Sequence, residues 1–269
     1  TQVQRSLAEI DPSFVDPLAG GRYTWAGIAG SMLAFFGTIL TEQDMLIRIA
    51  ATRDVRTAKI HVAVGGAVLS VFYVGLVLLG GAASVALRGA GIELTNPDAA
   101  FPALITSYVP TGIGVVIILA VMSAILSTTD TRLHATGMTW ARDLYSYARP
   151  EADEHALMRV SRWATVVLGL AATFVALRPP SPIIVLYAFR AVVLTSAFFV
   201  PVYLALFRPH LRGGAVLTAI AAGGAAGALA QIGSDWIGAI PATFVGVGTS
   251  VLTLGVVNHL LHRQERPRS

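Results

Sequence analysis

The sequence predicts an all-α polytopic membrane protein, a helix bundle with about seven transmembrane helices. Of its 269 residues, 55% are hydrophobic and only 13% are charged, whereas an ordinary soluble domain is about one quarter charged. The mean hydropathy is +0.69, and apolar runs of about 20 residues, the length that crosses a bilayer, recur along the chain. Because one soluble domain could not bury so many long apolar runs, multiple membrane spans are favoured.

The first expected span, at about residues 23–51, contains an interruption. Its stretch FFGTILTEQD, residues 35–44, combines Gly37 with a cluster of polar side chains inside an otherwise apolar segment. Such an interruption marks a break in the helix. The second expected span, at about residues 61–87, is continuously apolar apart from its ends.

Turn signals and five more apolar runs follow. Gly89, Gly91 and the Asn96–Pro97 pair mark turns, and residues 99–109 are expected to form a short surface helix before Pro110. Further spans are expected at about residues 112–145, 156–177, 183–207, 213–232 and 237–261.

The basic residues predict the orientation of the chain. Most Lys and Arg residues fall in alternate loops on one side, and the intervening loops contain only Arg5, Arg22, Arg88 and Arg178. The positive-inside rule places the first set in the cytoplasm. We therefore expect a multi-pass protein of a plasma membrane or bacterial inner membrane, with its C-terminus in the cytoplasm. The positive charge lies between apolar segments, so we expect the lipid bilayer, and no nucleic acid, as a partner.

A hydroxyl-rich cluster occupies the end of the third expected span. On a helix Ala124, Ser127 and Thr128 share one face, and Asp130 lies at its edge. Two hydroxyl oxygens and the Ala124 carbonyl can form part of a cage for a small hard cation such as sodium, and Asp130 is a candidate for an ion pathway. The alternative is that the hydroxyls bond back to their own helix or pack helices together, with Asp130 hydrated near the cytoplasmic interface.

Two stretches of the chain resemble the sodium:solute symporter family. AVMSAILSTTDTRLHATGMTWARDLY, residues 120–145, resembles the family's signature helix, and TEQDMLIRIAATRDVRTAK, residues 41–59, resembles the stretch after its sixth core helix. The resemblance covers roughly residues 24–210. It implies the leucine-transporter fold, in which two five-helix repeats of inverted topology hold substrate and ion near the bilayer midplane.

The resemblance also implies a domain organisation. Residues 1–22 become an extracellular or periplasmic loop, residues 23–207 the second five-helix repeat, residues 208–262 two peripheral transmembrane helices, and residues 263–269 a cytoplasmic tail. The first repeat is expected in an N-terminal part of the protein that this sequence lacks.

Carried over residue by residue, the resemblance implies site residues. Ala124, Ser127 and Thr128 match the family's sodium ligands on the signature helix, and the remaining ligands belong to the first repeat. Phe35 falls at a substrate-facing position, with Thr38 and Ile39 near gating positions, although the last two depart from the family's aromatic pattern. Leu69 stands where sugar carriers of the family have lysine, which argues against a sugar.

Arg190 lies within the fifth expected span, where burying an arginine costs about 2.5 to 3.5 kcal/mol on insertion scales. A partner or an aqueous cavity should offset that cost. In the family this helix borders the substrate pathway, so Arg190 and Tyr187 are candidate contacts for a solute, and the charge of Arg190 suits a solute with a carboxylate. The alternative is that Arg190 reaches the outer interface. Glu42, at the inner end of the first span, is expected to be solvated or to pair with Arg48 or Arg53.

Together these interpretations predict a sodium-coupled secondary transporter that imports a small organic solute by alternating access. Sodium is the coupling ion, and no other cofactor, metal or catalytic residue is expected. One alternative is a transporter-like membrane sensor or scaffold without transport activity. Another is an intramembrane enzyme, which is disfavoured because Asp130 has no second catalytic residue at a suitable spacing.

Overall fold

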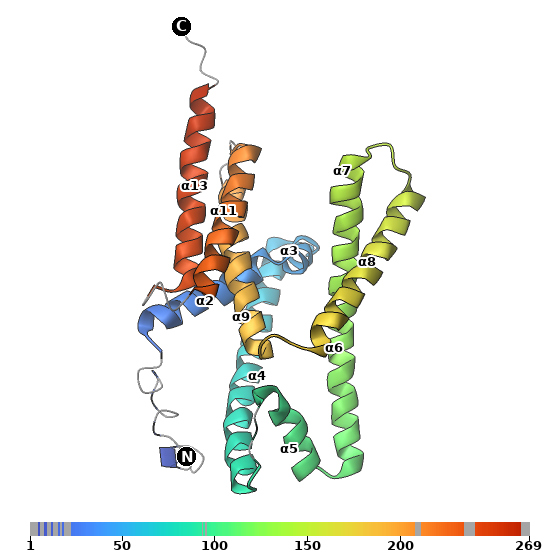
Figure 1. Ribbon diagram of the computed structural model, residues 1–269, viewed down its shortest axis with the longest axis vertical. Coiled ribbons are helices and arrows are strands. Elements are labelled where there is room, and N and C mark those ends of the chain that lie inside the picture. The colour runs from blue at the N-terminus through green and yellow to red at the C-terminus, as the bar shows by residue number, and fades with distance from the viewer. Residues whose placement is uncertain are drawn as a thin grey trace. The chain divides into compact units, whose positions relative to one another are not determined.

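The computed structural model describes residues 23–92, 94, 96–207, 211–233 and 240–264, with a few isolated positions before residue 23. All regular structure in this part of the chain is helical (Figure 1). The helices are α2 (Trp25–Thr41), α3 (Gln43–Ala50), α4 (Val55–Gly89), α5 (Ala100–Tyr108), α6 (Thr111–Thr139), α7 (Ser146–Ala148), α8 (Glu154–Leu177), α9 (Ile183–Leu194), α10 (Val200–Phe207), α11 (Gly213–Ile232) and α13 (Ala242–Gln264). Two π-helical segments, Trp140–Tyr145 and Thr195–Phe199, join α6 to α7 and α9 to α10.

The expected series of long apolar helices is confirmed. Six helical stretches in the described part are long and apolar enough to cross a bilayer. They are Val55–Gly89, Thr111–Ala148, Glu154–Leu177, Ile183–Phe207, Gly213–Ile232 and Ala242–His262. The remaining expected span is the interrupted one, which forms the 17-residue α2 and the 8-residue α3. The expected start of the last span, residues 237–239, lies outside the described residues.

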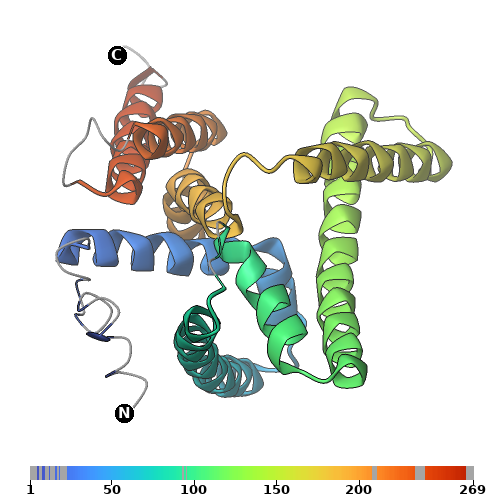
Figure 2. The same cartoon turned by 60° about the horizontal axis from the view of Figure 1, so that its bottom comes forward.

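The chain divides into two compact units, residues 1–90 with 183–269 and residues 91–182. In the first unit α2 packs against α9 and the following π-helical segment, and α11 packs along α13. Figure 2 shows α2, in blue, reaching the gold α9. Small buried side chains line these contacts, with Ala34 and Ala191 between α2 and α9 and Ala215 and Ala219 on α11. Small residues let apolar helices approach closely.

Helix α4, also in the first unit, has an exposed surface over most of its length. Leu87 is its one buried residue, whereas Val68 and Leu78 are 62% and 66% exposed. Asp54 caps its start, where the carboxylate accepts a hydrogen bond of 2.8 Å from the Thr57 N–H.

The second unit consists mainly of α6 and α8. Figure 2 shows the dark yellow α8 crossing α6. At the crossing, a Cβ added to Gly137 would lie 2.8 Å from the carbonyl oxygen of Ser161. Only glycine allows this approach, so the crossing depends on that position. Helix α5 confirms the short helix expected before Pro110.

Candidate functional site

The break in the first span occurs at Glu42, within the stretch where the sequence predicts it. Glu42 leaves the helical conformation, with φ −65° and ψ 127°, and α3 begins at the next residue. The Thr41 hydroxyl donates to the carbonyl oxygens of Gly37 at 2.9 Å and Thr38 at 3.1 Å. The Thr38 carbonyl also accepts a hydrogen bond of 3.0 Å from the Glu42 N–H, so the Thr41 hydroxyl adds side-chain bonds to the last turn of α2.

Hydroxyl groups hold the C-terminal half of α2 against α9 and the π-helical segment that follows it. The Thr38 hydroxyl donates to the Ala191 carbonyl at 3.0 Å and lies 3.1 Å from the Thr195 hydroxyl. The Thr195 hydroxyl in turn donates to the Ala34 carbonyl at 2.6 Å. Gly37 permits this contact, because a Cβ there would lie 2.8 Å from the Thr195 hydroxyl oxygen. Thr38 is only 2% exposed, so its side chain contributes to helix docking in this structure.

A second group of side chains, which we call the α2–α9 cluster, consists of Phe35, Glu42, Tyr187 and Arg190. The Phe35 and Tyr187 rings are stacked, with centroids 5.6 Å apart and planes inclined by 19°. The Arg190 guanidinium lies 5.8 Å from the centre of the Tyr187 ring, a cation–π arrangement, and forms an ion pair with Glu42. The expected partner of Arg190 is therefore a carboxylate of the same chain.

The ion pair of the α2–α9 cluster is largely withdrawn from the surface. The side chains of Arg190 and Glu42 are 31% and 18% exposed. Local sequence patterns do not connect Glu42 with Arg190, because 148 residues separate them. Of the two arginines expected as partners for Glu42, Arg48 and Arg53, the side chain of Arg48 lies outside the described part.

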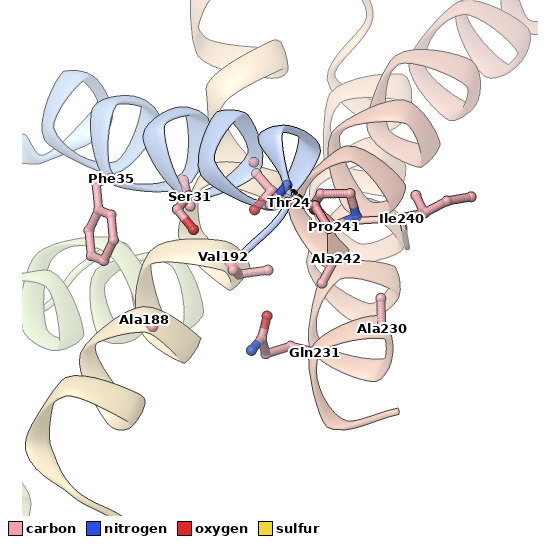
Figure 3. A pocket seen from close by; sticks show the side chains of 14 residues that line it. Thr24, Ser31, Phe35, Ala188, Val192, Ala230, Gln231, Ile240, Pro241 and Ala242 are labelled. Atoms are coloured by element: carbon pink, nitrogen blue, oxygen red, sulfur yellow. Dashed lines mark hydrogen bonds between the residues drawn. The ribbon is translucent and has the colours of Figure 1, made fainter. Parts of the chain in front are cut away.

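Phe35 also borders a cavity of about 330 Å³. The cavity lies between the start of α2, α9, the end of α11 and the start of α13 (Figure 3). Its polar groups include the side chains of Ser31 and Gln231, and Figure 3 shows the Gln231 amide turned into the space beside Val192. None of the described residues that line it is charged. An uncharged pocket that combines apolar side chains with a few polar groups is a candidate small-molecule site.

The other face of α2 carries an apolar groove that contains Phe35, Phe36 and Ile39. Ile39 is 46% exposed. The structure therefore separates the three residues expected to face the solute. Phe35 lies at the boundary between cavity and groove, Ile39 lies in the groove, and Thr38 lies in the contact with α9.

The hydroxyl cluster lies on α6, in the second unit. Helix α6 is regular through Ala124, Ser127 and Thr128, and all three residues are exposed, as is Asp130. The Thr128 hydroxyl donates to the Ala124 carbonyl at 3.2 Å. This is the bond expected under the alternative in which the hydroxyls bond back to their own helix. The Ser127 hydroxyl has no hydrogen-bond partner among the described residues. A hydroxyl that donates to a carbonyl keeps its oxygen lone pairs, so both side chains retain the capacity to bind a cation.

The sequence patterns did not reveal two elements of the α2–α9 contact, Thr195 and the Glu42–Arg190 pair. A signal for Thr195 exists, since it is a polar residue next to Ser196 within an apolar run. Within the described ranges, no group of three or more His, Asp or Glu side chains could hold a metal ion.

Comparison with known proteins connects this geometry to a family. The sodium:solute symporter family model matches residues 2–223. The sodium/pantothenate symporter of Haemophilus influenzae is 28% identical over 204 residues, which cover 75% of this chain and 41% of the relative. The sodium/pantothenate symporter of Escherichia coli is 27% identical over 242 residues, covering 88% and 49%. A sodium/mannose cotransporter of Bos taurus is 26% identical over 146 residues, covering 48% and 24%.

The chain thus spans less than half the length of these relatives. No solved structure matches it.

Proposed function

Because the chain belongs to the sodium:solute symporter family, we propose that it forms part of a symporter that imports a small organic solute together with sodium. The observation that carries this proposal is the family match together with exposed hydroxyl groups on a membrane-spanning helix. The match extends over the α2–α9 cluster and over α6. The relatives are named as sodium symporters for pantothenate and mannose, so sodium coupling is common to them and the solute varies.

Sodium is the coupling ion in this proposal. Its ligands on this chain are the Ala124 carbonyl and the hydroxyl oxygens of Ser127 and Thr128. Such neutral oxygens suit a hard monovalent cation that must be released on the other side. The remaining ligands come from a part of the complete protein outside this sequence. One sodium ion moving inward down a potential of 100 mV supplies about 2.3 kcal/mol, which can drive uphill uptake of the solute.

The solute binds at the α2–α9 contact in this proposal. The Phe35 and Tyr187 rings provide an apolar platform, and Arg190 provides a positive charge for a carboxylate. Ile39 extends the apolar surface, while Thr38 holds α2 in position. Since Arg190 is already paired with Glu42, a carboxylate-bearing solute competes with that side chain. Pantothenate, the solute named for two relatives, has a carboxylate.

In this proposal the protein lies in a cell membrane with its C-terminus in the cytoplasm. The asymmetric distribution of Lys and Arg between alternate loops supports this orientation. The six long apolar helices support a multi-pass protein.

Uptake into proteoliposomes tests the proposal. The complete protein should accumulate a radiolabelled solute, from a panel of carboxylates, amino acids and sugars, when an inward sodium gradient is imposed. Replacing external sodium by choline should abolish uptake. Tyr187→Ala should raise the KM of the transported solute, whereas Tyr187→Phe, which keeps the ring stacked on Phe35, should leave it nearly unchanged. Uptake that continues undiminished in choline would show that sodium is not the coupling ion.

A further inference from the structure

An apolar groove of about 430 Å³ lies on the outside of the second unit. Its walls come from α8 and from the start of the π-helical segment Trp140–Tyr145. The apolar residues that line it are Trp140, Val160, Trp163, Ala164, Val167 and Leu168. The groove is open, since Trp163 is 70% exposed and Trp140 48% exposed.

One cation lies at the mouth of this groove. Arg159 lines the apolar groove and also a neighbouring pocket that contains Arg149 and Glu151. Among the described residues neither arginine forms an ion pair, whereas Arg142 pairs with Glu154 at 3.8 Å. The carboxylate of Asp153 caps α8 by accepting a bond of 2.9 Å from the Ala156 N–H. Asp153 and Glu154 therefore have other partners, and Glu151, which shares the neighbouring pocket, forms no ion pair with Arg159.

The length of the groove matches one leaflet of a bilayer. From Arg159 to Leu168 the helix rises about 13 Å at 1.5 Å per residue, and half the hydrocarbon core of a bilayer is about 15 Å thick. Tryptophan and arginine at the end of a membrane helix are typical of the interface with water. The turn between α7 and α8 is on the side with the basic loops, which the positive-inside rule assigns to the cytoplasm.

We propose that this groove binds an anionic phospholipid of the cytoplasmic leaflet. The headgroup phosphate accepts hydrogen bonds from Arg159, with Arg149 nearby, and one acyl chain lies between Trp140 and Trp163. The charge favours this occupant, because an apolar partner helix would leave Arg159 without a counter-ion at the edge of the hydrocarbon, and the phosphate of a zwitterionic lipid is already balanced by the lipid's own amine. The inference does not depend on the transported solute or on sodium binding.

Native mass spectrometry of the complete protein tests the proposal. Protein released from vesicles of equal phosphatidylglycerol and phosphatidylethanolamine should retain phosphatidylglycerol preferentially. Arg159→Gln should reduce the retained fraction at least about fivefold, the effect of losing one charge-assisted contact. Arg162→Gln is the matched control, because Arg162 lies on the same helix about 150° from the centre of the groove face and does not line it. Equal retention by both variants, or no preference in the wild type, would overturn the assignment.

A second measurement covers the case in which Arg159→Gln does not fold. Dioctanoyl phosphatidylglycerol should raise the unfolding temperature of the wild-type protein, because a ligand that binds the native state stabilises it. Dioctanoyl phosphatidylcholine and inorganic phosphate should not. A matching shift with inorganic phosphate alone would mean that Arg159 binds a free anion, and a matching shift with phosphatidylcholine would mean that the charge is irrelevant. Either result would refute an anionic lipid site.

Discussion

Replacing Glu42 with Gln tests whether the ion pair between Glu42 and Arg190 holds the broken helix on α9. The substitution leaves the Arg190 guanidinium against the Tyr187 ring without a counter-charge. An unpaired arginine in a membrane span costs about 2.5 to 3.5 kcal/mol. The amide oxygen introduced at position 42 can still accept a hydrogen bond from Arg190, whose side chain is 31% exposed, so we expect a loss of about 1 to 3 kcal/mol in the free energy of unfolding.

The double variant Glu42→Gln with Arg190→Gln should recover most of this loss, since it removes both charges and leaves two amides that can bond to each other. Reversible unfolding of the complete protein in mixed micelles measures the coupling between the two positions. Glu154→Gln is the matched control, because the Arg142–Glu154 pair is 59% and 85% exposed. We expect that change to alter stability by less than about 1 kcal/mol. Additive effects of the two single variants would contradict the assigned coupling.

The remaining predictions concern helix packing and helix capping. Gly246→Ala should destabilise the bundle by about 1 to 3 kcal/mol, because the new Cβ would overlap the Ser196 hydroxyl and lie 2.9 Å from the Gly227 Cα. Gly248→Ala is the control: a Cβ at Gly248 would have no atom within 4 Å, so this change should be neutral or stabilising in the same unfolding assay. The hydrogen bond from the Thr57 N–H lowers the pKa of the Asp54 carboxyl below 3.8. The Asp54 cap on α4 should therefore persist above pH 3.8 and be lost as the pH falls through the folded pKa. A carbon-13 titration of Asp54 with a midpoint at or above 3.8 would disprove this.

Local sequence signals were sufficient for most of the helices. Ile183–Phe207 and Gly213–Ile232 occur with the expected bounds, because apolar length and turn residues determine where a membrane helix begins and ends. The break at Glu42 also falls within the expected stretch. The local sequence pattern indicates that a span exists and where it is interrupted.

Contacts between distant segments could not be predicted in the same way. The Glu42–Arg190 pair and the hydrogen bond from Thr195 to Ala34 join residues about 150 positions apart. Nothing in the local sequence around either residue indicates its partner, and Thr195 begins a π-helical segment, Thr195–Phe199, that the hydropathy pattern does not indicate. The family resemblance indicated that Thr38 lies near a gating position, but it did not show that the Thr38 hydroxyl is bonded to the Ala191 carbonyl.

Sodium binding to the purified complete protein tests the central claim most directly. Radioactive sodium should bind saturably to the wild type, and Ser127→Ala with Thr128→Ala should weaken the affinity at least about tenfold, or 1.4 kcal/mol. Thr129→Ala is the matched control, because that hydroxyl is also exposed and bonds back to Ile125 at 2.9 Å, but it points to a different face of α6. Unchanged sodium affinity in the double variant, or equal loss in the control, would contradict a sodium site at Ser127 and Thr128.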